Sequence, residues 1–563
     1  MRGIFHVDNS QYTRCWVEAD TGETIDIKQN VNSIRFFEGD DVIVEQGEVN
    51  KLIKSAVRDG TIHGTILLSD KMYGKYRKNK YYYKFIPYEK RLPAFLVPYT
   101  LSTQFQKKKI NKYACIRFTE WINTHPCGTL VSTIGDVNIT ENTYEYLKES
   151  NDIYSHSKHL KDIIRNKLHD KSIEEWHDYM LEKYPIEDRT DTIVFSIDPE
   201  GTKDIDDACS ICELDDGKRL LSIYIANVPL WLDTFNIWEE LTDNISTLYL
   251  PHRNYSMLPD ILANDVCSLV EKTRRFAFTM DVFLDKDNSI IQIEWKNTYI
   301  YVDSNESYSK IERNEYKNIL DITRTLNKNH NSYLPDGIQD SHDMIQYLMT
   351  MMNCEIAKIC ASNKFGIYRT MRSTDVDLNC IPATLHSLMR VWNSPGGKYT
   401  LYTEYEDTLR HDFIGATAYM HITSPIRRII DIVNMTLYLQ NVEHILDSKS
   451  FLSKWYTQHS INRINEKAKQ IRRVQNECKC IHTMLTSDIH DSINYGYVIH
   501  SQEQESTIQY NIYLPSLNIV HYIEYDKNIW NIPLKNFYSY KWKMHYIEDD
   551  YRIRKRLLLT FIE

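Results

Sequence analysis

An apolar segment that runs into a cluster of carboxylates is the feature that most constrains the fold of this chain. The segment 192–197 reads as a buried strand that delivers Asp198 at its carboxyl end, and Pro199 and Gly201 then turn the chain. The aspartates of this loop are Asp198, Asp204, Asp206 and Asp207. Like charges this close repel, so such a cluster persists mainly where a hard divalent cation neutralises it, and oxygen ligands favour magnesium, or manganese, over zinc. The alternative is a solvated acidic turn, which the preceding strand disfavours.

A second motif, residues 419–431, reads as the start of a helix. Ser424 is a good N-cap, Pro425 suits the first helical position, and the apolar residues after them recur at helical spacing. This assignment places Arg427 in the first turn, where its guanidinium and the helix amides can both address a phosphate. Asp431 follows one turn later and can hold the arginine in place. The alternative is an ordinary capped helix with an exposed ion pair.

Together the two motifs resemble the RNB family, which comprises ribonuclease II, RNase R and the eukaryotic exosome-type exoribonucleases. That family pairs an Ile-Asp-Pro-x-x-x-x-Asp-x-Asp-Asp-Ala loop with a later His-x-Thr-Ser-Pro-Ile-Arg-Arg-x-x-Asp segment, and this chain carries them at 197–208 and 421–431. Upstream, the segments 85–87, 91–93 and 134–137 look like parts of the second N-terminal OB-fold of the eukaryotic branch. The resemblance covers nearly the whole chain.

The resemblance implies an enzyme that hydrolyses single-stranded RNA from its free 3′ end and releases nucleoside 5′-monophosphates. All four aspartates of the loop would hold one or two magnesium ions, and Asp206 most resembles the family's indispensable acid. Arg427 would stabilise charge on the phosphate in the transition state. Tyr249 matches the aromatic residue that stacks on the terminal base, and Tyr368 sits where another aromatic is common. Without the resemblance both would be assigned to packing, because the chain has 40 tyrosines.

Basic residues cluster locally although the net charge is −10. The first cluster, which includes Lys75, Arg77 and Lys78, alternates with tyrosines. This pattern suits single strands, because bases stack on rings and phosphates meet cations. The alternative is an exposed edge strand protected by lysine. Arg428 of the second motif is the remaining candidate for RNA binding.

The pattern changes along the chain predict an α+β protein in which an RNB catalytic domain is flanked by two N-terminal OB-fold β-barrels and one C-terminal OB-fold β-barrel. The expected parts are a cold-shock-like OB-fold at 1–48, a second OB-fold at 49–150, a helical linker at 151–188, the catalytic domain at 189–487 and the C-terminal OB-fold at 488–563. The last long helix of the catalytic domain is expected at about 455–486, with an apolar stripe that packs into the core.

Several classes of protein are disfavoured by the sequence. No apolar run approaches the roughly 20 residues that span a bilayer, and the N-terminus lacks the apolar core of a signal peptide, so we expect an intracellular, cytoplasmic protein. The 11 cysteines are irregularly spaced, and the pair Cys209 and Cys212 has no second pair, which predicts reduced core thiols. The absence of a glycine-rich phosphate loop disfavours nucleotide-triphosphate chemistry.

The chain departs from the family at supporting positions. Tyr224 and Asn227 stand where the family usually has His and Asp, and Ile429 and Ile430 replace Tyr-Pro. We expect these changes to weaken or retune activity rather than abolish it. Because the chain starts at the first OB-fold, we also expect a free-standing monomer without the endonuclease domain that tethers the exosome-type enzyme. A catalytically weak or inactive RNA-binding regulatory protein is the alternative and a DNA hydrolase a third possibility, but the intact acids and Arg427 favour the exoribonuclease.

Overall fold

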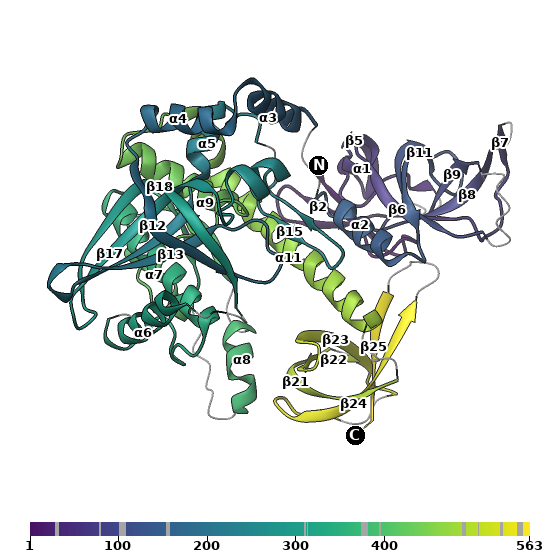
Figure 1. Ribbon diagram of the computed structural model, residues 1–563. Helices are drawn as coiled ribbons and strands as arrows, with labels where there is room; N and C mark the ends of the chain where they lie inside the picture. Colours follow the sequence, from purple (N-terminus) through teal and green to yellow (C-terminus); the bar gives the residue numbers. More distant parts are fainter. Residues whose placement is uncertain are drawn as a thin grey trace. The chain divides into compact units, whose positions relative to one another are not determined.

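The chain is described here by a computed structural model that covers most of its 563 residues (Figure 1). The described residues are 1–28, 33–77, 80–100, 109–153, 158–241, 243–308, 311, 313–330, 332–372, 381–392, 396–486, 491–504, 506–529, 533–548 and 555–562. They divide into two compact units. The first unit consists of Met1–Tyr154, Leu250–His252 and Arg473–Glu563, and the second of Ser155–Tyr249 and Arg253–Arg472.

The first unit begins with a five-stranded antiparallel sheet in the order β3-β2-β1-β4-β5. Its strands are β1 (Arg2–Val7), β2 (Cys15–Ala19), β3 (Thr24–Asp26), β4 (Asp41–Glu45) and β5 (Glu48–Lys54). Alternate residues such as Phe5 and Val7 are buried in its core. The sheet continues past the expected boundary at residue 48, because Gln46 and Gly47, both with positive φ, turn the chain directly from β4 into β5.

The second sheet closes on itself. Its elements are α1 (Ala56–Asp59), β6 (Ile62–Leu67), β7 (Lys75–Arg77), β8 (Lys80–Pro87), β9 (Phe95–Tyr99), β10 (Lys112–Glu120), β11 (Cys127–Asp136) and α2 (Thr140–Ser150). The strand order is β6-β10-β11-β9-β8-β7, and an additional β6–β8 pairing leaves β7 at the edge. Phe37, which precedes β4, packs among the core residues of this second barrel, so the two barrels share an apolar contact.

The second unit is organised around a closed barrel of five strands. The helices α3 (Lys158–Asp170) and α4 (Ile173–Lys183) precede it, and its strands are β12 (Glu187–Asp198), β13 (Asp207–Glu213), β14 (Arg219–Ala226), β17 (Arg274–Leu284) and β18 (Ile290–Ser307). The barrel closes where β12 pairs in parallel with β18. In β14 the side chains alternate, so Leu221 and Ile223 share one face while Ser222 and Tyr224 share the other.

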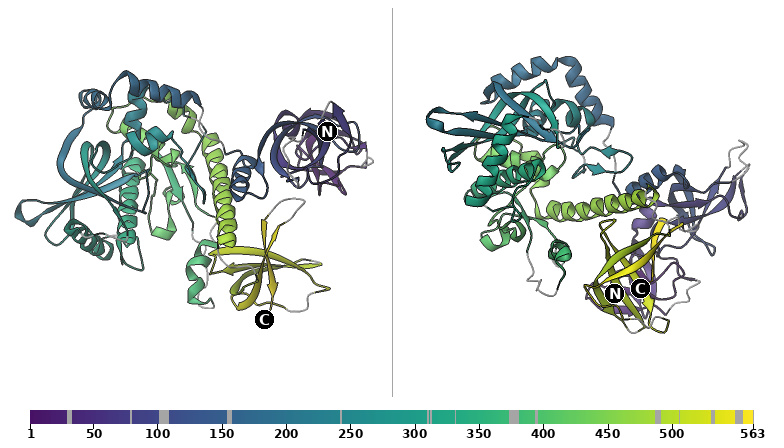
Figure 2. Two further views of the ribbon diagram at one scale, coloured as in Figure 1. Left: turned by 45° about the vertical axis from the view of Figure 1, so that its right-hand side comes forward. Right: turned by 60° about the horizontal axis from the view of Figure 1, so that its bottom comes forward.

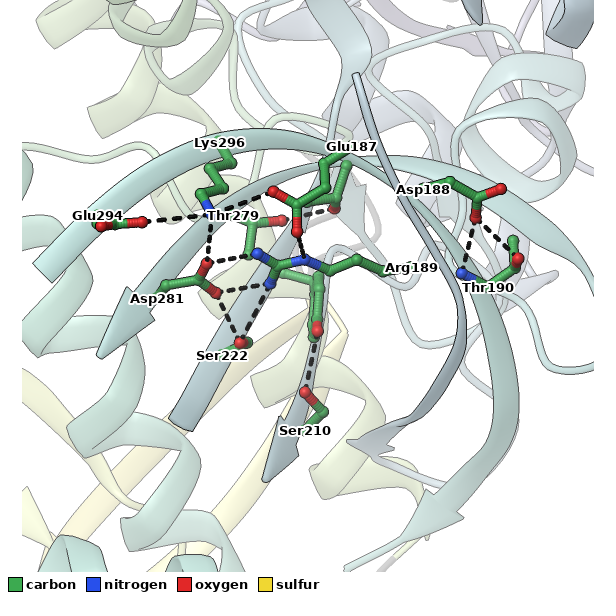
Figure 3. Close-up of polar contacts among 12 residues, drawn as sticks. Glu187, Asp188, Arg189, Thr190, Ser210, Ser222, Thr279, Asp281, Glu294 and Lys296 are labelled. Carbon is green, nitrogen blue, oxygen red and sulfur yellow. Dashed lines mark hydrogen bonds and ion pairs between the residues drawn. The ribbon is translucent and has the colours of Figure 1, made fainter. Parts of the chain in front are cut away.

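One face of these barrel strands carries a connected set of polar side chains (Figure 3). Arg189 donates to both carboxylate oxygens of Asp281, at 2.7 and 2.5 Å. Asp281 also accepts from Ser222 Oγ at 2.6 Å, and Lys296 Nζ lies 3.0 Å from Glu187. Asp281 is fully buried, so its charge depends on these partners.

Helices and short strands fill the rest of the second unit. They are α5 (Val228–Phe235), β15 (Leu248–Tyr249), β16 (Asn254–Tyr255), α6 (Asn314–Asn329), α7 (Ser341–Ser362), β19 (Ile367–Thr370), α8 (His386–Trp392), β20 (Lys398–Leu401), α9 (Ile429–Asn441) and α10 (Lys449–Trp455). Every residue of α9 from Ile429 to Leu439 is buried. The long helix α11 (Gln458–Thr486) begins in the second unit and ends in the first, close to the helix expected at 455–486.

The C-terminal residues form a last antiparallel sheet, drawn in yellow-green in Figure 2. Its strands are β21 (Ile493–Glu503), β22 (Thr507–Leu514), β23 (Ile519–Asp526), β24 (Ser539–Glu548) and β25 (Lys555–Phe561), in the order β23-β22-β21-β24-β25. Together these observations confirm the α+β class with OB-like barrels at both ends. Among the described residues, no helix combines the length and the apolar character that crossing a membrane requires.

Candidate active site

The acidic loop connects two neighbouring strands of the closed barrel. Asp198 is the last residue of β12 and Asp207 the first of β13. Gly201 has φ +83°, a conformation that residues with a side chain rarely adopt, so this glycine makes the turn of the loop. The side chain of Ser196 donates to Asp198 Oδ2 at 2.8 Å, which fixes one carboxylate from within β12.

A cavity of about 760 Å³ opens above this loop, and every residue that lines it lies in the second unit. Its lining includes the carboxylates Asp198, Asp204, Asp206 and Asp207, together with Tyr249, Tyr308 and Arg427. The loop therefore brings the four expected acids to one cavity, as the pattern of strand, turn and return predicts.

Burial and the charges of neighbouring carboxylates raise the pKa values of Asp198, Asp206 and Asp207. Burial raises the pKa of Asp206 to about 7, although Arg427 opposes the shift. Burial, with a contribution from Asp204, raises the pKa of Asp198 to about 6. The pKa of Asp207 is well above its usual range because of burial and the nearby charges of Asp198 and Asp206. A cation bound in the cavity would relieve this repulsion.

The second motif is a turn rather than a helix start. The amides of Arg427 and Arg428 both donate to the carbonyl of Ser424, at 3.3 and 3.0 Å, and α9 begins only at Ile429. The expectation that Arg427 lies in the first helical turn is therefore wrong. Arg428 is extended because its backbone pairs with Ser246, a contact between distant segments that local sequence does not reveal.

Asp206 joins this turn to the acidic loop. Its Oδ1 accepts the backbone N–H of Ile426 at 2.8 Å, and its Oδ2 accepts Nε of Arg427 at 3.0 Å. The partner of Arg427 is thus Asp206. Asp431, the expected partner, instead accepts from Arg428 Nη2 and from the amide of Ser424, both at 2.8 Å.

Tyr249 lies in β15 and lines the cavity. Its side-chain hydroxyl donates to Asp204 Oδ2 at 3.0 Å. Burial, and then the charge of Asp204, raises the pKa of Tyr249, so the hydroxyl stays a donor at neutral pH. The residue is 39% exposed, which leaves part of the ring available to a ligand.

Two other candidates do not face the cavity. Tyr368 in β19 is fully buried, and its hydroxyl donates to the carbonyl of Phe365 at 2.9 Å. The side chain of Arg428 is committed to Asp431. The structure therefore contradicts a direct RNA-stacking role for Tyr368, because a ring with no exposed face cannot meet a base. Arg428 holds the turn together and is absent from the cavity lining.

The basic candidates Lys75 and Arg77 lie in β7, in the first unit. Both are exposed, and the guanidinium of Arg77 lies over the ring of Tyr76, 5.3 Å from its centroid. The edge position of β7 agrees with the alternative of a lysine-protected edge strand. Lys78 falls outside the described residues.

Sequence reasoning did not find Tyr308, Ile345 or Met349. Tyr308 directly follows β18, and the register of β12 and β18 places Asp198 opposite Ser307. Burial, together with the charges of Asp207 and Asp198, raises the pKa of Tyr308 to about 12. Ile345 and Met349 lie one turn apart on α7 and give the cavity an apolar wall. The one-turn spacing of Ile345 and Met349 on α7 is visible in the sequence. The parallel pairing of β12 with β18, which brings Tyr308 to the cavity, is not.

The donor set fits a hard cation by its chemistry. In the part of the chain that is described, no three His, Cys, Asp or Glu side chains are already placed to hold one metal ion. The carboxylates of the cavity nevertheless offer only oxygen ligands, and the pKa values of Asp198 and Asp207 are raised by burial and by neighbouring carboxylates, which a bound cation would oppose. Because both oxygens of Asp206 are engaged by the turn, Asp198, Asp204 and Asp207 are the better candidates for ligands.

Two family models match the chain. The RNB domain matches residues 186–321, and the Dis3-like cold-shock domain 2 matches residues 82–152. The first match contains the acidic loop and ends before the turn that carries Arg427. These matches correspond to the closed barrel of the second unit and to the second barrel of the first.

Curated relatives are similar over part of their length. Ribonuclease R of Ureaplasma parvum is 37% identical over 110 residues, which are 19% of this chain and 15% of that protein. The exosome complex exonuclease dis3 of Schizosaccharomyces pombe is 29% identical over 193 residues, which are 33% of this chain and 19% of that protein. The alignments thus span less than a quarter of the length of either relative.

Solved structures show the same fold over the whole chain. Mycoplasma genitalium RNase R, in complex with ribose methylated single-stranded RNA, matches with a TM-score of 0.72 at 17% identity and 100% coverage of both chains. Yeast Ssd1, a pseudonuclease, matches with a TM-score of 0.59 at 15% identity, over 94% of this chain and 80% of that one. Residues 186–321 of this chain thus match the RNB domain, and the chain as a whole is similar in fold to Mycoplasma genitalium RNase R.

Proposed function

We propose that this protein is a magnesium-dependent hydrolase that shortens single-stranded RNA from its 3′ end and releases nucleoside 5′-monophosphates. The observation that carries the proposal is the bond between Asp206 and Arg427, which unites an acidic loop and a cationic turn 221 residues apart in one cavity. Four aspartates from one loop with Arg427 beside them suit the cleavage of a phosphodiester, whose charge must be balanced in the transition state.

Each residue of the cavity has a distinct role in this proposal. Asp198, Asp204 and Asp207 would hold magnesium, with manganese as a substitute, and the bound ion would polarise the scissile phosphate and activate water. Asp206 orients Arg427 by accepting a hydrogen bond from its Nε. The other N–H groups of the guanidinium are then left to bind the phosphate. The side chain of Arg427 is 43% exposed, so it can be reached from the cavity.

Tyr249 would bind the terminal base. Its hydroxyl donates to Asp204, which shows that the ring lies next to the acidic loop. When the terminal base stacks on this ring, the phosphodiester on the 5′ side of that nucleotide would lie near the carboxylates, since the ring and the carboxylates belong to one cavity. Ile345 and Met349 on the apolar wall would limit the water around the reacting phosphate.

The departures from the family lie outside this machinery. The hydroxyls of Tyr224 and Ser210 are 2.9 Å apart, and Asn227 Nδ2 donates to Asn297 Oδ1 at 2.8 Å. Neither Tyr224 nor Asn227 lines the cavity. Because Tyr224 and Asn227 lie away from the cavity, this placement supports an active enzyme in which only the hydrogen bonds around the barrel differ from those of the family.

A catalytically inactive RNA-binding protein is the second candidate. Its motivation is the similarity of fold to Ssd1, whose structure is described as that of a pseudonuclease, together with the lack of a ready three-ligand group among the described residues. This candidate would bind single-stranded RNA with a free 3′ end through the same cavity and barrels but would release no product.

Digestion of end-labelled oligonucleotides separates the candidates. The protein is incubated with single-stranded RNA or DNA of one sequence, with magnesium, with manganese or with a chelator, and the products are identified by chromatography. Nucleoside 5′-monophosphates from RNA, dependent on either metal, support the proposal. Binding of RNA without products in both metals would establish the RNA-binding candidate, and equal digestion of DNA would establish a nuclease without selectivity for RNA.

A further inference from the structure

A buried serine, Ser268, holds the middle of the acidic loop. It lies between β16 and β17 in the second unit and is fully buried. Its hydroxyl donates to the carbonyl of Lys203 at 2.7 Å and accepts the backbone N–H of Ile205 at 2.9 Å. One side chain therefore bonds both of the peptide groups that flank Asp204.

Among the candidate metal ligands, Asp204 depends most on such a contact. Asp198 is the last residue of β12 and Asp207 the first of β13, so the barrel strands position both of them. Asp204 lies in a part of the loop that is neither helix nor strand. The backbone groups there take their hydrogen-bond partners from outside the loop, and Ser268 supplies a partner on each side of Asp204.

The serine is itself attached to the barrel. Arg275, a buried residue of β17, donates from its Nε to the carbonyl of Ser268 at 2.7 Å. The next residue, Leu269, donates its backbone N–H to the carbonyl of Ile205 at 3.0 Å. The hydroxyl of Ser268 therefore cannot move away from the loop unless these bonds also break.

The same short segment is connected to the other side of the metal site. Asn305 Nδ2 donates to the carbonyl of Leu269 at 3.0 Å and to Ser196 Oγ at 2.9 Å. Ser196 Oγ in turn donates to Asp198 Oδ2 at 2.8 Å. A chain of hydrogen bonds thus runs from Asp198 to the segment that holds the backbone around Asp204, and it constrains the separation of the two carboxylates.

Ser268 is absent from the lining of the acidic cavity, so it acts on the site only through the loop. Magnesium demands nearly ideal octahedral geometry, which makes its binding sensitive to small displacements of a carboxylate. Residues that orient a ligand without touching the metal typically change metal affinity by about 10–100-fold when they are replaced.

We propose that Ser268 is a positioning residue that sets where the Asp204 carboxylate meets the bound metal. This inference rests on the metal site of the proposed function, but it does not require that the protein hydrolyse RNA. It adds to that site a residue that touches neither the metal nor the substrate.

Direct binding of Mn²⁺ to the full chain, without RNA, tests this role. Electron paramagnetic resonance measures the free ion while the protein is titrated. Ser268→Ala removes the hydroxyl and should weaken the tightest Mn²⁺ site by about tenfold. In a nuclease assay of the same variant, the magnesium concentration that gives half the maximal rate should rise by a similar factor.

Ser210→Ala is the matched control. Ser210 is a buried serine of β13 whose hydroxyl lies 2.9 Å from that of Tyr224, away from the acidic cavity. The substitution removes the same atom from the same barrel and should leave Mn²⁺ affinity unchanged. Circular dichroism shows whether each variant is folded. Ser268→Cys, which keeps a weak donor and acceptor, should give a smaller loss and replaces Ser268→Ala if the alanine variant does not fold.

A double-mutant cycle separates positioning of Asp204 from a general loosening of the loop. Asp204→Asn is measured alone and together with Ser268→Ala. Because Ser268 acts through Asp204, its replacement should change Mn²⁺ affinity by less than about twofold in the Asp204→Asn background. The same tenfold loss in both backgrounds would overturn the proposal.

Two further results would also overturn the positioning role: wild-type Mn²⁺ affinity in folded Ser268→Ala, and an equal loss in Ser210→Ala. A wild-type protein that binds no Mn²⁺ would contradict both this role and the proposed function. If Mn²⁺ binding responds to Ser268→Ala as expected but the wild type releases no nucleotide from RNA, the positioning role is supported and the hydrolase is contradicted.

Discussion

Asp206 accepts Nε of Arg427 at 3.0 Å, and this bond connects the two motifs that the sequence places 221 residues apart. The carboxylate is buried, and its other oxygen accepts the backbone N–H of Ile426 at 2.8 Å. Asp206 therefore has a positioning role in the resting structure, because it fixes both the backbone and the side chain of the arginine turn.

Asp206→Asn should abolish most catalysis and leave RNA affinity nearly unchanged. The amide keeps an acceptor for Ile426 but presents an N–H₂ group to Arg427, and it removes a charge from the cavity. We expect kcat to fall by about 1,000-fold, close to 4 kcal/mol in barrier, while phosphate contacts elsewhere maintain binding. Single-turnover rates and affinities measure the two effects separately. Glu213→Gln, at the other end of β13, is the control. A rate within about tenfold of wild type would show that Asp206 is dispensable.

Arg427→Lys tests whether the guanidinium has two tasks. Lysine keeps the charge, but a single ammonium cannot both pair with Asp206 and present a fork to the phosphate. We expect kcat to fall by about 100-fold with a smaller change in KM. Arg463→Lys disrupts a comparable but more exposed pair with Asp243, whose atoms are 2.9 Å apart, and should retain activity. If Arg427→Lys raises KM and leaves kcat at the wild-type value, Arg427 contributes to substrate binding alone.

Tyr249 has a ring and a hydroxyl that two substitutions separate. Tyr249→Ala removes a stacking surface worth about 1–3 kcal/mol, so short RNAs should bind less tightly and the final fragments should be longer. Tyr249→Phe keeps the ring and removes only the bond to Asp204, so it should keep the wild-type end product. The length of the final fragment is measured for wild type and both variants, and the affinity of each protein is measured for RNAs of increasing length. An end product that is unchanged in both variants would assign Tyr249 to packing.

The buried pair of Arg189 and Asp281 should dominate the stability of the closed barrel. Asp281→Asn leaves the cation without a full charge partner, which costs about 3–5 kcal/mol when a pair is buried. Asp243→Asn removes a more exposed carboxylate and should cost about 1 kcal/mol or less. Urea unfolding of both variants gives the comparison. If the two variants lose the same free energy of unfolding, the buried pair of Arg189 and Asp281 contributes no more to stability than the exposed pair.

Acid should destabilise the protein in part through His177. Burial, and then the charge of Arg275, lowers the pKa of His177 to about 4, below the usual value of about 6.5. Between these values the unfolded chain takes up a proton that the folded chain does not. This contribution to stability is complete above about pH 6.5 and is lost progressively as the pH falls toward 4, by about 1.4 kcal/mol per pH unit.

His177→Gln isolates that effect. Glutamine can replace the hydrogen bond of His177 Nδ1 to the hydroxyl of Tyr299, which spans 2.9 Å, but it does not titrate. The slope of unfolding free energy against pH between about 4.5 and 6 should therefore be shallower in the variant, by up to one proton. Identical slopes in the two proteins would show that His177 is already protonated in the folded state.

The sequence predicts that the aspartates lie together because the geometry of their loop is local. A buried strand, a glycine turn and a returning strand are adjacent in the chain, so the pattern of 192–207 is enough to bring Asp198 and Asp207 together. The barrels at both ends are likewise predictable, since strand alternation is a short-range signal. The resemblance added Tyr249, which no local pattern distinguishes from the other tyrosines.

The expectations that the structure contradicts depend on contacts between segments that are far apart in the sequence. The turn before α9 looked like a helix start, but the amide of Ile429 donates to the carbonyl of Ile245 and thereby holds Arg428 extended. Tyr368 matched an aromatic position of the family, yet its ring is buried in the core. Tyr308 reaches the cavity only through the parallel pairing of β12 with β18. Such contacts join segments many residues apart, and spacing in one sequence does not encode them.

The identity of the first product is the most direct test of the central claim. RNA labelled at its 3′-terminal nucleotide is mixed with excess protein and magnesium, and the reaction is stopped within one turnover. We expect that the label leaves as a nucleoside 5′-monophosphate, and that Asp206→Asn releases it about 1,000-fold more slowly. Label that first appears in internal fragments, or at the same rate in wild type and Asp206→Asn, would contradict this expectation.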